Sequence, residues 1–222
     1  VVVVNWNARD LTLACLRSLA EQTYSAKIVC VDNNSEDGSA DAIAAEFPEV
    51  ALIRSGRNLG FAGGNNLALR TVTTDWVVLL NNDAEVGPDF LANLAAAADA
   101  AAPDVGALTA RALLAEPVDG VVLVNSTGNQ VRTDGYGQDR GWLEPADDHH
   151  PGPDVFGFCG AAAALRTSAL GEVGLFDEDF FLYYEDSDLS WRLRRAGWRV
   201  EYCAEAVAHH HHSASTVEAS RT

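Results

Sequence analysis

Two groups of acidic side chains have the residue types and settings that catalysis uses. Asp83 comes three residues after the end of the apolar run 76–80. A carboxylate at the end of a buried strand is well placed to hold a hard cation through its oxygens. Farther along, Glu185 and Asp186 stand among the aromatic residues of segment 176–188. Partial burial and mutual repulsion would raise at least one carboxyl pKa there, as suits a group that accepts a proton.

Each group also has a purely structural interpretation. Asp83 could serve as the N-cap or turn residue of the next element. Glu185 and Asp186 could lie in the first turn of the helix that follows them, where negative charge is favoured.

Two polar segments have the composition of a nucleotide site. In the first, 32–38, short carboxylates and amides at a strand end could bind a base or a ribose, although the same residue types form ordinary turns. The second, 57–66, is rich in glycine, which lets a backbone approach a ligand, and the helix after it offers amides to a phosphate. It is not the GxGxxG fingerprint of dinucleotide-binding proteins, and it follows the third expected strand rather than the first.

Four consecutive histidines, His209–His212, form a further candidate for metal binding. Imidazole is a frequent metal ligand. An affinity tag is the alternative, but tags are usually longer and terminal, whereas Ser213–Thr222 follows this run.

The elements that must position these residues alternate between strand and helix. The apolar and β-branched runs are typical of buried parallel strands. Polar clusters follow three of these strands, at 5–7, 32–35 and 81–83, and open parallel sheets bind ligands at that edge. We therefore expect an α/β fold, a mostly parallel open sheet with helices on both faces. The expected strands are 1–4, 27–31, 51–53 and 76–80. The first expected helix starts at Asp10, which would cap it. Two further helices are expected over 39–47 and 65–71, and a fourth from Pro88 to 102.

The second half of the chain is less regular. We expect strands at 105–114, 121–124 and 198–203, and a helix over 185–196. Segment 127–153 is rich in Gly, Asp and Pro, which predicts loops and hairpins over the open side of the sheet. No linker divides the chain, so we expect one domain with two unequal lobes, 1–104 and 105–222.

Bulk properties narrow the class of function. The chain has 222 residues, of which 48% are apolar, and a net charge of −17. This charge argues against nucleic acid as a partner, because no basic patch is available. A diphosphate ligand would need a local cation or a cluster of backbone amides. The four scattered cysteines indicate buried free thiols in a reducing cytoplasm.

Read in order, these segments resemble glycosyltransferase family 2, and within it the bacterial rhamnosyltransferase-like branch. The resemblance covers nearly the whole chain and implies a GT-A-type nucleotide-diphospho-sugar transferase fold. Lobe 1–104 would bind the nucleotide sugar, and lobe 105–222 would hold the acceptor and the catalytic residues. The segments that carry it are 3–7, 31–39, 58–66, 79–83, 174–181, 184–189 and 192–197.

The resemblance also implies roles for individual residues. Asp32 and Asn33 would contact the base and ribose, and the loop with Asn58, Gly60 and Asn66 would lie beside the nucleotide. Three strand-end amides complete the expected substrate-binding set, namely Asn5, Asn81 and Asn82.

The metal motif of the family is Asp-x-Asp, and here it reads Asn81-x-Asp83. Asp83 would therefore carry most of the binding of a divalent metal, Mn²⁺ or Mg²⁺, with His209 as the expected second ligand. The resemblance makes Asp186 the base, with Glu185 beside it in the catalytic motif. A single base with direct displacement predicts inversion at the sugar carbon.

The expected partners are a nucleotide-diphospho-sugar donor, with deoxythymidine-diphosphate rhamnose favoured by the resemblance, and a glycan or lipid-linked acceptor. We expect a cytoplasmic protein at the inner face of the membrane. No basic amphipathic helix supports more than peripheral contact. Relatives often continue with further helices at the acceptor site, so a chain ending at Thr222 is expected to be truncated.

Three other classes fit less well. A sugar nucleotidyltransferase would carry a basic, glycine-rich signature near the first strand, where residues 4–9 have none. A non-catalytic nucleotide-sugar-binding module would not need Glu185 and Asp186. A nicotinamide-dependent oxidoreductase would need the glycine fingerprint in the first turn.

Overall fold

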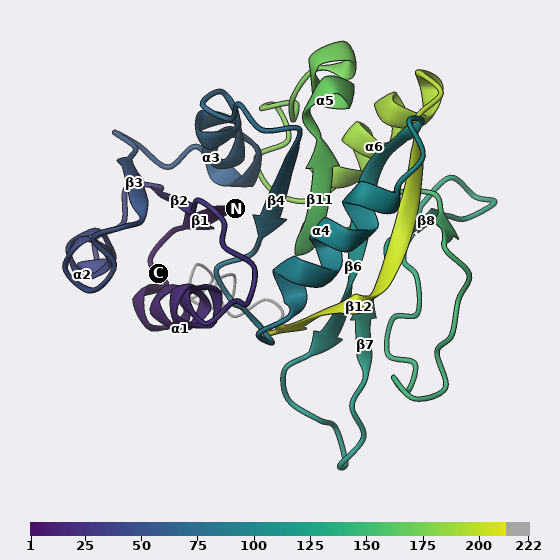
Figure 1. The fold of residues 1–222 in the computed structure, drawn as a ribbon, viewed down its shortest axis with the longest axis horizontal. Helices are drawn as coiled ribbons and strands as arrows, with labels where there is room; N and C mark the ends of the chain where they lie inside the picture. The colour runs from purple at the N-terminus through teal and green to yellow at the C-terminus, as the bar shows by residue number, and fades with distance from the viewer. Residues whose placement is uncertain (212–222) are drawn as a thin grey trace.

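The computed structural model describes residues 1–211 and forms one ten-stranded mixed sheet. The sheet order is β10-β12-β6-β11-β4-β1-β2-β3, with β5 paired to β12 and β7 to β6 (Figure 1). The strands are β1 (Val2–Asn5), β2 (Val29–Asp32), β3 (Ala51–Arg54), β4 (Trp76–Leu80), β5 (Ala84–Val86), β6 (Val105–Leu114), β7 (Val124–Ser126), β10 (Asp154–Val155), β11 (Ala162–Arg166) and β12 (Arg199–His210).

Strand direction brings distant segments to one edge of the sheet. β1, β2, β3 and β4 are mutually parallel. β11 is antiparallel to both β4 and β6, and β12 is parallel to β6, so β6 and β12 point the same way as β1–β4. The polar residues at the ends of β1, β2, β4 and β12 therefore all lie at the carboxyl edge, where parallel sheets bind ligands.

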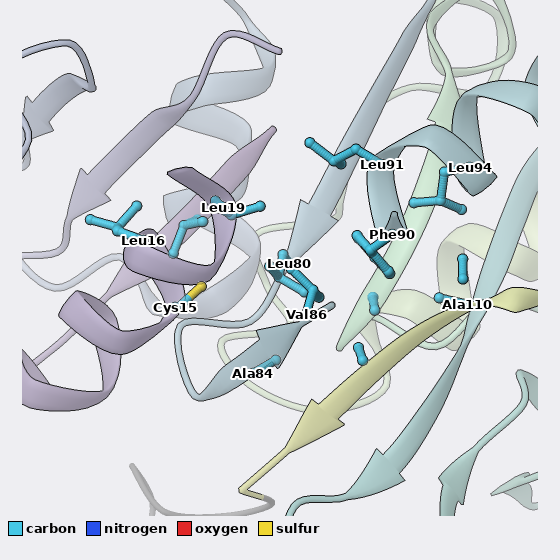
Figure 2. Packing of buried hydrophobic residues seen from close by; sticks show 14 of the residues in the cluster. Cys15, Leu16, Leu19, Leu80, Ala84, Val86, Phe90, Leu91, Leu94 and Ala110 are labelled. Atoms are coloured by element: carbon cyan, nitrogen blue, oxygen red, sulfur yellow. The ribbon is translucent and has the colours of Figure 1, made fainter. Parts of the chain in front are cut away.

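Helices cover both faces, as the alternation of strand and helix predicts. α1 (Arg9–Ala20), α2 (Ser39–Glu46) and α4 (Phe90–Ala100) pack on one face, and α3 (Gly60–Leu69), α5 (Thr167–Val173) and α6 (Glu185–Arg195) on the other. Successive strand residues belong to opposite cores, as with Leu79 and Leu80. Figure 2 shows the first core, where Leu16 of α1 and Leu94 of α4 lie on either side of Leu80. Burial on both faces explains why these strands are continuous apolar runs.

A small hairpin lies apart from the main sheet. β8 (Asn129–Val131) pairs antiparallel with β9 (Gly137–Asp139). The prediction of loops and hairpins for segment 127–153 is confirmed.

Several predicted boundaries are wrong. α3 begins at Gly60 rather than at residue 65, so most of the glycine-rich segment is helix. α1 begins at Arg9 after Ala8, and Asp10 lies in its first turn instead of capping it. α4 begins at Phe90, two residues after Pro88. The predicted strand at 121–124 is instead β7, which begins only at Val124.

The last strand differs most from expectation. It continues past Cys203 to His210 because a bulge between Cys203 and Val207 restores pairing with β6, as bulges do when they bend a strand without ending it. β5, β11 and α5 were not predicted at all. β11 is mostly alanine, which has no strand signal of its own.

Other expectations concern the cysteines and the membrane. All four cysteines are free; Cys15 and Cys30 are buried, but Cys159 and Cys203 are only partly so. Within residues 1–211, none of the helices has both the length and the apolar character that crossing a bilayer requires.

Candidate active site

Two adjoining cavities lie at the carboxyl edge of the sheet. Cavity I, about 360 Å³, lies over the ends of β1, β2 and β4 and is lined by residues such as Trp6, Asn33 and Asn58. Cavity II, about 450 Å³, lies beside it and is lined by Glu185, Asp186 and residues of the β8–β9 hairpin. The two cavities share Phe61, Asn81, Asp83, Gly160 and Leu182.

The wall of cavity I is fixed by the side chain of Asn33. Its Nδ2 donates to the Asn58 side-chain oxygen at 2.9 Å and to the Gly60 carbonyl at 3.0 Å, and its Oδ1 accepts from the Leu59 amide at 2.9 Å. These bonds join the end of β2 to the start of α3. The structure therefore places Asn33, Asn58 and Gly60 together on cavity I, and their contact with a nucleotide stays a prediction.

Gly60 is held where no other residue fits without movement. Its φ is +70°, and a Cβ built there would lie 2.2 Å from the Phe181 carbonyl oxygen. The next amide, of Phe61, donates to that same carbonyl at 2.8 Å. The segment before α6 is thus hydrogen-bonded to the start of α3, and Phe181 and Leu182 close cavity I from the side of α6.

Asn5 and Asp32 lie behind cavity I rather than on its wall. Asn5 is fully buried and donates to Asp32 Oδ1 at 2.9 Å, to Ser39 and to Ser35. Neither residue lines either cavity. The polar atoms of the two side chains bond each other and the adjacent turn, and their expected contact with substrate stays a prediction.

Asn82 belongs to the same buried network but also reaches cavity I. Its Nδ2 donates to Thr12 Oγ1 at 3.0 Å, and Thr12 in turn donates to Asn5 Oδ1 at 2.7 Å. The residue lines cavity I with its neighbours Asn81 and Asp83.

Asn66 faces away from both cavities. It is buried, donates to the Phe176 carbonyl at 2.8 Å and to Glu178 Oε1 at 3.0 Å, and accepts from the Phe176 amide. Its neighbour Asn65 lines cavity I instead, because consecutive residues of a helix point about 100° apart.

Asp83 meets a histidine between the two cavities, but the histidine is His210. His210 Nε2 lies 3.0 Å from Asp83 Oδ1, and both side chains are buried. His209, the predicted ligand, is exposed on the opposite side of β12. Alternation along a strand turns neighbouring side chains to opposite faces. His209 is thus corrected to His210, while His212 lies outside the described residues.

Two amides orient His210. Its Nδ1 lies 2.6 Å from Asn125 Oδ1, and its Nε2 lies 3.2 Å from Asn81 Nδ2. The amide oxygen at Nδ1 fixes the ring orientation, so that Nε2 faces Asp83. Asn125, on β7, was missed by the sequence analysis, and an isolated asparagine in an irregular region offered no signal for it.

Burial and hydrogen bonding shift the pKa of Asp83 in opposite directions. Burial alone would raise its pKa, but the hydrogen bond and charge of His210 outweigh burial and hold the pKa below the ordinary value. The carboxylate is therefore ionised at neutral pH. Within residues 1–211, no three His, Cys, Asp or Glu side chains form a metal-binding group. An oxygen and a nitrogen donor 3.0 Å apart fit a divalent cation that takes its remaining ligands from elsewhere.

Asp186 stands on the wall of cavity II at the start of α6. Its Oδ2 accepts from the Gly160 amide at 2.9 Å and its Oδ1 from the Ser187 amide at 2.6 Å. Gly160 belongs to both cavities. The carboxylate is half-buried and oriented by the backbone.

Glu185 is more deeply buried than Asp186, with 6% of its surface exposed. Burial, and then the charge of Asp186, raise its pKa to about 7. Its Oε2 has no hydrogen-bond partner among the described residues. The prediction that this motif contains a carboxyl group with a raised pKa agrees with the structure.

The two residues before the motif have unusual backbone conformations. Tyr183 and Tyr184 have φ of 72° and 68°, and both rings are more than half exposed at cavity II. A non-glycine residue in the left-handed region costs roughly 1 kcal/mol or more, and such strain gathers at functional sites.

The α/β fold of this chain matches solved structures of GT-A-type glycosyltransferases. A mannosyltransferase from Pyrobaculum calidifontis, solved with GDP-Man and Mn²⁺, has a TM-score of 0.70 over 99% of this chain and 58% of its own, at 23% identity. GalNAc-T7, solved with UDP, GalNAc and Mn²⁺, has a TM-score of 0.73 over 94% of this chain and 42% of its own, at 15% identity. The model of glycosyl transferase family 2 matches residues 1–174, and the chain belongs to this family of sugar-transferring enzymes.

Curated relatives agree with the predicted branch. The N-acetylglucosaminyl-diphospho-decaprenol L-rhamnosyltransferase of Mycobacterium tuberculosis is 32% identical over 92% of this chain and 72% of its own length. The O-antigen chain rhamnosyltransferase RfbN of Salmonella typhimurium is 25% identical over 96% of this chain and 66% of its own. This chain thus spans about two thirds of the length of these enzymes, and 58% of the mannosyltransferase.

Proposed function

We propose that this chain is the catalytic domain of an inverting, metal-dependent glycosyltransferase that acts on a hydroxyl of a glycan or lipid-linked acceptor. The observation that supports this function best is the meeting of the two cavities at Asp83. On one side of Asp83 lies the amide-lined cavity I, and on the other lies Asp186 in cavity II. A donor whose nucleotide occupies cavity I would present its sugar between the metal site and the base.

The nucleotide is proposed to lie in cavity I, against Trp6 and the Asn58–Gly60 segment that Asn33 fixes. Little of this wall is charged, so base and ribose would be bound by packing and by amides. This assigns donor binding to the lobe 1–104, as the resemblance implied.

Asp83 and His210 would hold the divalent metal at the point where the diphosphate passes from one cavity to the other. The metal would neutralise charge on the departing nucleoside diphosphate. A site with an imidazole nitrogen suits Mn²⁺ better than Mg²⁺, which prefers oxygen ligands alone. A bound diphosphate would need this cation for two reasons. The chain has a net charge of −17, and among the described residues no Lys or Arg lines cavity I or II.

Asp186 is the proposed base. Two backbone amides hold its carboxylate in place, and cavity II gives an acceptor access to it. As the acceptor oxygen bonds to the anomeric carbon, the bond from that carbon to the diphosphate oxygen breaks, and the hydroxyl proton passes to Asp186. One displacement with one base inverts the sugar carbon. The relatives named above favour rhamnose as the sugar.

The test is binding and hydrolysis of a panel of nucleotide sugars, with Mn²⁺ and with chelator. We expect one donor to bind only with metal, Asp83→Ala to abolish that binding, and Asp186→Asn to bind donor without turnover. Asp99→Ala, an exposed aspartate on α4, is the matched control. If no nucleotide sugar binds wild type under either condition, the proposal is refuted. Binding without hydrolysis or transfer would leave a non-catalytic nucleotide-sugar-binding module.

A further inference from the structure

A third cavity continues from cavity II across the β8–β9 hairpin. Cavity III, about 490 Å³, shares Gln138 and Asp139 of β9 with cavity II. Cavity III therefore adjoins, at β9, the cavity that contains Asp186. The remaining lining residues of cavity III are Gln130, Gly141, Trp142 and Glu144.

The buried side chain of His149 fixes the far wall of cavity III. The buried His149 places its Nδ1 2.7 Å from Glu144 Oε2 and its Nε2 2.9 Å from Thr127 Oγ1. Gly141 has a φ of +81°, and a Cβ there would lie 2.5 Å from the His149 ring. The turn that presents Trp142 and Glu144 is thus packed directly on a fixed imidazole.

The near wall of cavity III is formed by Gln138 and Asp139 of β9. The preceding residue, Gly137, packs the hairpin against the start of α6, because a Cβ built there would already lie 3.5 Å from Ser187 Oγ and 3.7 Å from the Tyr184 ring. Cavities II and III adjoin at Gln138 and Asp139, which line both.

The chemistry of cavity III suits a neutral saccharide. Two amides, two carboxylates and an indole line it, and Trp142 is 41% exposed. Sugar hydroxyls donate to carboxylates and exchange hydrogen bonds with amides, while the apolar face of a pyranose packs on an aromatic ring. Among the described residues, no Lys or Arg lines cavity II or III. A diphosphate in cavity III would face two carboxylates and no cation, so charge repulsion disfavours a lipid diphosphate as its occupant.

We infer that cavity III is a saccharide subsite that binds the sugar next to the accepting sugar, so that the acceptor presents at least a disaccharide to this domain. The inference rests on the proposed function, because cavity II must hold the accepting sugar beside Asp186. It assigns Gln138, Trp142 and Glu144 to recognition of the acceptor.

The test is saccharide binding measured without donor, by saturation-transfer difference NMR. The probes are the methyl glycosides of rhamnose, galactose, mannose and N-acetylglucosamine, and disaccharides that extend each by one hexose. We expect at least one disaccharide to bind about ten-fold more tightly than its monosaccharide, with saturation reaching both rings. Trp142→Ala is expected to remove that gain. Trp191→Ala, which removes a similarly exposed indole on α6 that lines none of these cavities, is expected to keep it.

Two results would overturn the inference: no disaccharide of the panel exceeds its monosaccharide, or Trp142→Ala binds the disaccharide as wild type does. Because the assay contains no nucleotide sugar, failure of the donor panel described above is a separate result. If the Trp142→Ala protein does not fold, Glu144→Gln takes its place, because it keeps the side-chain shape. It is expected to weaken disaccharide binding and to leave monosaccharide binding unchanged.

Discussion

Replacing Glu185 by glutamine tests the electrostatics of the catalytic motif without any substrate. The change keeps the size of a side chain that is 6% exposed and removes its titration. In the folded protein, burial and the neighbouring Asp186 raise the Glu185 pKa from 4.5 to about 7. The folded state therefore binds the proton more tightly than the unfolded state. The resulting stabilisation is complete below about pH 4.5 and is lost as the pH rises through about 7.

The size of the effect follows from the same pKa values. At about 1.4 kcal/mol for each pH unit between them, the full contribution is about 3 kcal/mol. About 2.5 kcal/mol of it disappears between pH 5 and pH 8. The glutamine variant has no such dependence at this position, so its free energy of unfolding should rise relative to wild type by about that amount over the interval.

Urea unfolding followed by tryptophan fluorescence at several pH values between 5 and 8 provides the measurement. Glu49→Gln, at an exposed position, controls for the change of charge. Parallel stability profiles for wild type and Glu185→Gln would refute the reasoning. They would mean that Glu185 reaches solvent, or finds a proton donor, in the protein in solution.

Three further outcomes are expected from the site geometry. His210→Ala should weaken Mn²⁺ affinity in the presence of donor at least about ten-fold, whereas His209→Ala should leave it unchanged. Calorimetry measures both affinities, and equal effects would contradict the proposal that His210 is the metal ligand. Asn125→Leu removes the acceptor at the His210 Nδ1 and should lower Mn²⁺ affinity about 10–100-fold, with electron paramagnetic resonance of bound Mn²⁺ as the readout. Gly60→Ala should lower the free energy of unfolding, measured with urea, by more than Gly38→Ala does. Both glycines have positive φ, but only a Cβ at Gly60 meets a backbone oxygen. Equal losses of stability would show that the Phe181 carbonyl moves aside at little cost.

The strands and helices that form the core were predictable because their signal is local. A continuous β-branched run such as Val2–Val4 becomes a strand with helices on both sides, and residues 76–80 match β4. The parallel direction of these strands then brings Asp83 and the amides of β2 to one edge. This part of the site therefore needed no knowledge of the three-dimensional packing.

The residues missed or exchanged depend on tertiary contacts. The resemblance implied Asn66 as a member of its loop, but which asparagine of α3 faces cavity I depends on how the helix packs. His209 was expected because the resemblance implies a histidine after the last strand, whereas β12 continues past its bulge to His210 and alternation turns His210 inward. A bulge has no reliable mark in a single sequence.

The position of β12 has a consequence for how the domain assembles. This strand follows the other strands of the sheet along the chain, yet it lies between β6 and β10 and supplies buried residues to both cores. Until it pairs, one edge of β6 stays open to association with other chains. His210 and Asn81 meet although they are 129 residues apart, a long-range closure of the kind that slows folding. The proposed metal site lacks His210 until β12 has paired, so Mn²⁺ retention would report whether this strand is in place.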